Sequence, residues 1–178
     1  MKNFILFTVA LLSPVTYAAQ ECKNNIAPST PDNRFTLNND GTVLDKQTGL
    51  LWMQCRLGQN WANNDCSDDI VEYNWIDALA AAEDTNFAGF SDWRLPNIKE
   101  LASIVELSCK NPSINEFIFP NSISIDSWQT RATEYWTSTP YAIKGNNQYS
   151  YYIDFGLGED SEWRRSSEYL VRLVRTAQ

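Results

Sequence analysis

The stretch Asp92-Trp93-Arg94-Leu95-Pro96-Asn97-Ile98-Lys99-Glu100-Leu101 specifies a sharp corner between an extended segment and a helix. Pro96 fixes its own φ and disfavours a helical conformation at the residue before it, so the segment carrying the tryptophan is predicted to be extended. Asn97 can cap the first turn, and Glu100 can reach back to the Asn97 N–H to complete a capping box. Apolar residues follow at helical spacing, so a helix with one buried face is expected from Asn97 to near Cys109.

Two side chains at this corner are predicted to be structural. Trp93 is expected in the core, where a large aromatic ring contributes most by burial. Arg94 lies beside it and should be partly buried, and a buried guanidinium needs a carboxylate partner. The candidates for that partner are Asp92, Glu100 and Asp45.

The other elements are predicted from periodicity and turn residues. Asn74 is expected to cap a helix that runs to about Asp84, and Gly49 should supply the left-handed residue of a β-hairpin. At least one of Arg172 and Arg175 should face inward and be paired. The predicted strands are residues 42–45, 50–53, 135–138, 149–155 and 169–175, whereas residues 56–69 and 110–131 are expected to be loops.

Composition and order along the chain indicate one exported domain. The 178 residues include no histidine and carry a net charge of −8 at pH 7. Residues 1–19 have the pattern of a secretory signal peptide, with Lys2, a short apolar run and small residues around Ala18-Ala19. Residues 20–39 are expected to be an extended lead-in and residues 40–178 a single domain, and no later segment is apolar enough to span a membrane.

All four cysteines lie in the part that would be exported, which favours two disulfides over free thiols. Three pairings are possible. Cys55 and Cys66 flank a short polar loop, so we favour Cys55–Cys66 together with Cys22–Cys109. The second bridge would tie the N-terminal lead-in to the end of the helix that begins at Asn97.

A family resemblance rests on five motifs that occur in order along the chain. They are Asp45-x-x-Thr48-Gly49-Leu50-x-Trp52, Asp92-Trp93-Arg94-Leu95-Pro96-x-x-x-Glu100-Leu101, Asn115 to Phe119-Pro120, Tyr135-Trp136-Thr137-Ser138-Thr139 and Val171-Arg172-x-Val174-Arg175. This series resembles the Lcl C-terminal domain family, named for the C-terminal domain of a bacterial collagen-like adhesin. The resemblance covers residues from about Asp40 to Arg175.

The resemblance implies a disulfide-stapled α+β domain, with two helices packed on a twisted, mainly antiparallel sheet related to the C-type-lectin-like architecture. The segment around Arg94 and Glu100 is also similar to formylglycine-generating-enzyme-type domains, but their chemistry needs a catalytic cysteine pair, and all four cysteines here have structural assignments. The named adhesin binds sulfated glycosaminoglycans. The present chain is acidic and lacks a collagen-like repeat, so the resemblance implies the fold more than the ligand.

Several classes of function are excluded or disfavoured by composition. Without histidine, a Ser-His-Asp or Cys-His catalytic set and a histidine-based zinc site are excluded. The cysteines do not form CxxC pairs, and the negative charge opposes nucleic acid as a partner. No catalytic residue, metal ligand or cofactor is therefore predicted.

The acidic loop after Cys55 leaves two alternatives open. Its carboxylates could serve a glycan hydrolase, or together with Asn63 and Asn64 they could hold Ca²⁺. A solvated loop held by the Cys55–Cys66 bridge is the simpler interpretation. The carboxylates concerned are Asp65, Asp68, Asp69 and Glu72.

The tryptophans in polar surroundings are the best candidates for ligand contact, because an indole can stack on a sugar ring while polar neighbours bond its hydroxyls. These are Trp61, Trp128 and Trp163, with Arg164 and Arg165 beside the last, whereas Trp52, Trp75, Trp93 and Trp136 are expected in the core. We therefore expect an exported, non-catalytic domain that binds a glycan or a protein at the bacterial cell surface or in the periplasm. The alternatives are a glycan hydrolase and a structural subunit of an envelope assembly.

Overall fold

The computed structural model describes residues 20–67, 71–125, 131–142 and 147–177, and the predicted signal peptide lies outside these residues. The helices are α1 (Trp75–Glu83), α2 (Ile98–Ala102) and the 3₁₀ helix η1 (Asp32–Arg34). The strands are β1 (Glu21–Cys22), β2 (Phe35–Leu37), β3 (Thr42–Asp45), β4 (Leu50–Met53), β5 (Asn60–Ala62), β6 (Asp65–Ser67), β7 (Cys109–Lys110), β8 (Ser124–Ile125), β9 (Arg131–Ala132), β10 (Glu134–Pro140), β11 (Tyr149–Asp154), β12 (Glu159–Arg164) and β13 (Val174–Thr176). Among these described residues, no helix is long and apolar enough to cross a membrane.

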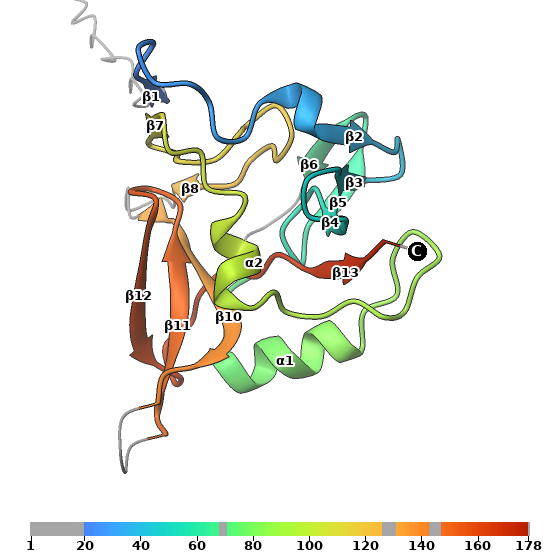
Figure 1. Ribbon diagram of the computed structural model, residues 1–178. Helices are drawn as coiled ribbons and strands as arrows, with labels where there is room; N and C mark the ends of the chain where they lie inside the picture. The colour runs from blue at the N-terminus through green and yellow to red at the C-terminus, as the bar shows by residue number, and fades with distance from the viewer. Residues whose placement is uncertain (1–19, 68–70, 126–130, 143–146, 178) are drawn as a thin grey trace, which may run out of the picture.

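The strands form several antiparallel sheets where one had been expected (Figure 1). A four-stranded sheet has the order β13-β4-β3-β2, and a three-stranded sheet has the order β10-β11-β12. Three short ladders pair β1 with β7, β5 with β6 and β8 with β9. The predicted α+β class with two α-helices is confirmed, while the C-type-lectin-like arrangement stays a prediction.

Strand β4 is buried on both faces and divides the core in two. Trp52 points to one side, where it packs with Leu101 of α2, and Leu51 points to the other, where it packs with Trp93. Successive residues of a strand face opposite sides, so a strand covered on both faces reads as a continuous apolar run. This explains the sequence Leu-Leu-Trp-Met. The four tryptophans expected in the core, Trp52, Trp75, Trp93 and Trp136, are all buried.

The corner predicted from the sequence is present. The Asn97 side chain accepts hydrogen bonds from the first turn of α2, and the Glu100 carboxylate accepts the Asn97 N–H at 2.8 Å, which completes the capping box. Trp93 is 3% exposed, and its indole N–H donates to the Phe87 carbonyl at 3.1 Å. Arg94 forms two hydrogen bonds of 2.8 Å with the Glu100 carboxylate, which is one of its three predicted partners.

The helix after this corner is much shorter than predicted: α2 ends at Ala102 and does not approach Cys109. The Ser103 hydroxyl donates to the Glu100 carbonyl at 2.7 Å, a side-chain bond that competes with helix continuation. Ile104 and Val105 are β-branched and fully or nearly buried outside the helix, and Val105 forms an isolated β-bridge with Ile114. Burial of these side chains in the core therefore overrides the apolar periodicity.

Other strand boundaries also differ from the prediction. The predicted loop at residues 56–69 contains β5 and β6, and the acidic strand β12 was not predicted. Edge strands need little apolar alternation, because much of their surface meets solvent. The predicted strand at 169–175 is reduced to β13, preceded by isolated bridges at Tyr169 and Leu170.

Both C-terminal arginines are engaged, as expected. Arg172 is fully buried, and its guanidinium donates to the carbonyls of Met53 and Gln54 and to the Ser122 hydroxyl. Burial lowers its pKa below the usual value of an arginine. Arg175 forms a two-pronged pair with Asp92, with contacts of 2.6 and 3.1 Å. Arg172 thus connects the end of β4 to the C-terminal segment through neutral oxygens.

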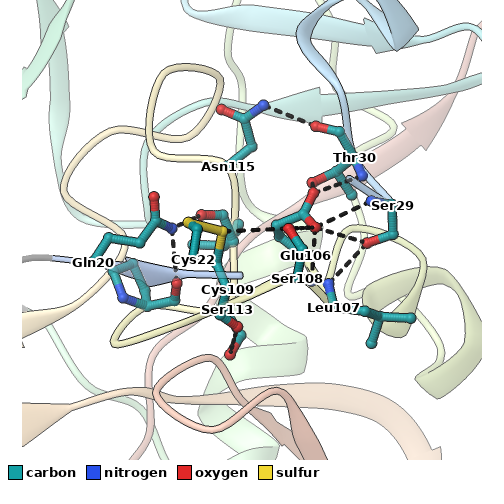
Figure 2. Close-up of a disulfide and its surroundings, with 12 residues drawn as sticks. Gln20, Cys22, Ser29, Thr30, Glu106, Leu107, Ser108, Cys109, Ser113 and Asn115 are labelled. Carbon is teal, nitrogen blue, oxygen red and sulfur yellow. Dashed lines mark hydrogen bonds between the residues drawn. A yellow bond between two sulfur atoms is a disulfide. The ribbon is translucent and has the colours of Figure 1, made fainter. Parts of the chain in front are cut away.

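The favoured disulfide pairing, Cys22–Cys109 and Cys55–Cys66, is confirmed. Close to Cys109, the buried carboxylate of Glu106 holds the N-terminal segment (Figure 2). It accepts hydrogen bonds from the backbone N–H and hydroxyl groups of Ser29, Thr30 and Ser108. Burial alone would raise the pKa of Glu106, but these hydrogen bonds outweigh it and lower the pKa to about 2.

Truncation of the core tryptophan tests the corner. Trp93→Ala should lower the free energy of unfolding by about 3–5 kcal/mol, because it removes a buried aromatic ring and leaves a cavity. Chemical denaturation with a constant m-value would measure this. Trp163→Ala is the matched control, since Trp163 is half-exposed, and should cost about 1 kcal/mol or less. Equal losses for the two variants would contradict the assignment.

The Glu106 clasp predicts a specific pH dependence. The pKa falls from 4.5 to about 2 on folding, so the carboxylate stabilises the fold fully above pH 4.5, and this stabilisation declines as the pH falls toward 2. At neutral pH, Glu106→Gln should cost about 3 kcal/mol, and the gap to wild type should close on acidification. Denaturation series at several pH values would measure it. The exposed Glu159→Gln is the control, and a pH-independent gap would contradict the prediction.

Candidate functional site

The predicted ligand-contacting tryptophans do not lie in one place. Trp61 is on β5 and Trp163 is on β12, on opposite sides of the view in Figure 1, whereas Trp128 lies outside the described residues. Trp61 is half-buried and packs against Gly41, the residue before β3. The approach is so close that a Cβ at Gly41 would lie 2.7 Å from the Cγ of Trp61. Trp61 therefore packs on the scaffold, and Trp163 remains as a separate candidate.

Trp163 projects from an edge strand and is 51% exposed. In the register of β11 and β12, Trp163 lies opposite Ser150 and Arg164 lies opposite Tyr149. Paired residues share a face and successive residues alternate, so Trp163 and Ser150 lie on one face of the sheet and Arg164 and Tyr149 on the other. The predicted cluster is thus split between two faces.

Arg165 is fixed in place on the face of Trp163. Its Nε donates to the Ser150 hydroxyl at 2.8 Å and to the Tyr149 carbonyl at 3.2 Å. Its guanidinium carbon lies 4.1 Å from the centre of the Trp75 ring, a cation–π contact. Trp75 is itself buried and donates its indole N–H to the Thr137 carbonyl at 2.8 Å. The guanidinium is therefore held in place by the hydrogen bonds of its Nε and by the stacking of its planar face on Trp75.

Three other arginines form ion pairs with carboxylates. Arg34, Arg94 and Arg175 pair with Asp45, Glu100 and Asp92, respectively. Within the described part of the chain, no carboxylate pairs with Arg165, and no hydrogen bond from its terminal nitrogens is found. We call Trp163, Arg165, Ser150 and Trp75 the Trp163 surface. It combines an exposed ring with a positioned guanidinium whose terminal donors have no partner among the described residues.

Sequence reasoning did not single out three tyrosines at the same end of the sheet. Tyr141 and Tyr151 form an edge-to-face pair with ring centres 5.2 Å apart, and Tyr149 lies opposite Arg164. All three are half-buried. The alternation of Tyr149 and Tyr151 with polar residues predicts the strand that the structure shows as β11, but the partner strand β12 was not predicted. Tyr149 and Tyr151 lie on the face opposite Trp163.

The acidic loop has structural contacts where it is described. Asp65 accepts hydrogen bonds from the Cys66 N–H and from the Asn121 side chain, at 2.8 and 2.9 Å. Asn63 and Asn64 adopt positive φ in the turn between β5 and β6, a conformation that asparagine tolerates. Asp68 and Asp69 lie outside the described residues, so the hydrolase and calcium alternatives stay predictions. Across the residues that are described, no group of three potential metal ligands was found.

Two cavities are further possible sites. One, of about 500 Å³, lies between the N-terminal segment and the Cys22–Cys109 region, and Lys23, Pro28 and Asn115 are among its lining residues. The other, of about 520 Å³, lies between α1 and the Trp93 corner. Glu106 at the first is engaged by its hydrogen bonds, and Arg94 and Glu100 at the second neutralise each other. Neither cavity offers a positioned, unpaired charge comparable with Arg165.

Comparison with known families identifies one match. The Lcl C-terminal domain matches residues 41–175, which span β3 to β13 and include the Trp163 surface. None of the curated proteins compared with the chain matches it.

Proposed function

The chain belongs to the Lcl C-terminal domain family, and we propose that it is an exported, non-catalytic binding domain whose Trp163 surface holds an acidic ligand. The family supports a role at the bacterial cell surface or in association with an adhesin. Two disulfides support a site of action outside the reducing cytoplasm. The pattern of residues 1–19 supports export by a cleaved signal peptide.

The observation that carries this proposal is the fixed guanidinium of Arg165. Stacking on Trp75 and hydrogen bonding through Nε hold the group before any ligand arrives, so little side-chain entropy is lost on binding. The planar donors of arginine match a carboxylate or sulfate with two parallel hydrogen bonds. A single acidic group is therefore the best complement to this residue.

Trp163 defines the rest of the ligand. It shares a sheet face with Ser150, to which Arg165 is bonded, so the exposed indole and the guanidinium are on the same face of the sheet. An indole ring offers an apolar face for the C–H groups of a sugar, while polar neighbours bond its hydroxyls and acidic substituent. A sugar that carries a carboxylate or sulfate fits both groups. A protein ligand that offers a carboxylate beside an apolar residue is the alternative.

The overall charge limits the size of the ligand. A chain with a net charge of −8 repels a long polyanion at distances up to the Debye length, about 8 Å at physiological ionic strength. A local contact between one acidic group and Arg165 is not prevented by that repulsion. We therefore expect a preference for glycans with isolated acidic groups over densely sulfated chains.

A glycan array followed by titration of the best binder tests the proposal. Arg165→Ala and Trp163→Ala should each weaken binding about tenfold or more, because each removes one of the two recognition elements. Arg164→Ala removes the same charge from the opposite face of the sheet and is the matched control; its affinity should stay within about twofold of wild type. Melting curves should show that all variants are folded.

Three results would count against the proposal. An array without binders would leave the carbohydrate version unsupported, and a pull-down would then test the protein alternative. Equal losses for Arg164→Ala and Arg165→Ala would indicate non-specific charge attraction. Hydrolysis of a bound glycan would contradict the non-catalytic assignment and favour the hydrolase alternative.

A further inference from the structure

The two disulfides differ in their exposure to solvent. Cys22 is exposed and Cys109 is half-buried, and both line the cavity of about 500 Å³ beside the N-terminal segment. Cys55 and Cys66 are buried, with exposed fractions of 1% and 5%. A thiolate that reduces a disulfide must reach one of its sulfur atoms, so an exposed bridge reacts faster than a buried one. Of the two bridges, Cys22–Cys109 meets that requirement in the folded protein.

The backbone around the exposed bridge is held by a short ladder. Cys22 and Cys109 lie opposite each other in the pairing of β1 with β7, and each of these strands has two residues. The bond between their sulfur atoms is drawn in Figure 2. The Lys23 N–H adds one hydrogen bond to the Ser108 carbonyl, at 2.8 Å. A short ladder at the surface opens at a lower free energy than the core, so thermal opening exposes this bridge further.

The next anchor along the chain does not depend on the bridge. The Glu106 carboxylate accepts hydrogen bonds from the backbone N–H and hydroxyl groups of both Ser29 and Thr30. Further on, β2 pairs with β3. These contacts would hold the chain from Ser29 onward after the bridge is broken. Residues 20–28 precede them and would be released.

We propose that the Cys22–Cys109 bridge is a site of thiol–disulfide exchange, at which a dithiol releases residues 20–28 while the rest of the domain stays folded. Five of the released residues line the cavity beside the bridge, so their release would remove one of its walls; they are Gln20, Lys23, Asn24, Ile26 and Pro28. The inference goes beyond the proposed function and is independent of it, because neither the bridge nor residues 20–28 belong to the Trp163 surface.

The exchange proceeds in two steps. A thiolate of the dithiol attacks the Sγ of the more exposed Cys22, a new S–S bond forms, and the Sγ–Sγ bond breaks with the electron pair leaving on Cys109. The second thiol of the reductant then attacks its own partner sulfur in the mixed disulfide and releases Cys22. The reductant closes its own disulfide and is oxidised by two electrons, while the bridge gains two electrons and two protons.

Timed alkylation of the folded protein tests the first part of the proposal. The protein is incubated with dithiothreitol, free thiols are blocked with iodoacetamide at intervals, and mass spectrometry identifies the modified cysteines. Cys22 and Cys109 should become modified about tenfold or more faster than Cys55 and Cys66, because reduction of the buried bridge needs a larger opening. Circular dichroism should remain that of the folded protein during the faster phase. In denaturant the difference between the bridges should largely disappear.

Trypsin cleavage after Lys23 tests the release of the segment. Protein alkylated at Cys22 and Cys109 should be cut there about tenfold or more faster than the oxidised protein, because a protease needs a locally unfolded backbone. The double variant Cys22→Ser with Cys109→Ser should be cut equally fast without any reductant. The matched control, Cys55→Ser with Cys66→Ser, should be cut at the wild-type rate, and circular dichroism should show that both double variants are folded.

Each contrary outcome overturns a stated part of the inference. Equal reduction rates for the two bridges, or faster reduction of Cys55–Cys66, would overturn the exchange site. Unfolding of the domain as Cys22–Cys109 is reduced would overturn the statement that the remainder stays folded. Slow cleavage after Lys23 in the reduced protein would overturn the release of residues 20–28. None of these results bears on the affinity of the Trp163 surface for its ligand.

Discussion

Burial of β4 on both faces is the constraint on which the rest of the fold depends. A central strand with apolar side chains on both sides needs a cover on each, and α2 supplies part of one while α1 and the Trp93 corner supply the other. Its backbone also pairs with a neighbouring strand on each edge, β3 on one and β13 on the other. Arg172 completes this arrangement, because its guanidinium bonds the carbonyls of Met53 and Gln54 where the ladder ends. The buried guanidinium here supplies hydrogen bonds to backbone oxygens, and buried backbone oxygens need such partners.

The N-terminal segment belongs to the same structure although the family match begins at residue 41. Strand β2 pairs with β3, Phe35 enters the core, and Thr30 is buried against Glu106. The Cys22–Cys109 bridge fixes the segment at its other end. The chain thus adds an N-terminal segment to the matched domain, which contacts β3 at one end and residues 105–115 at the other.

Sequence reasoning succeeded where local chemistry determines local structure. The capping box at Asn97, the α1 cap at Asn74 and both disulfides were predicted from spacing and residue type alone. It failed where long-range packing determines the structure. For example, α2 ends at Ala102, and Ile104 is buried in the core outside the helix. The site followed the same rule: the sequence pointed to Trp163, but the role of Arg165 depends on Trp75, which lies 90 positions earlier. No pattern in the sequence joins those two residues.

The outer edge of β12 has a consequence for solubility. An exposed strand edge is a template on which other chains can add strands and aggregate. Along β12 the residues Glu159, Asp160, Glu162 and Arg164 place charges on this edge, leaving Trp163 as the large apolar side chain among them. Two copies brought edge to edge would place several carboxylates close together, which opposes pairing in most registers. These charged residues interrupt the apolar alternation by which a strand is predicted from sequence. The same charges would oppose aggregation of the domain at high concentration.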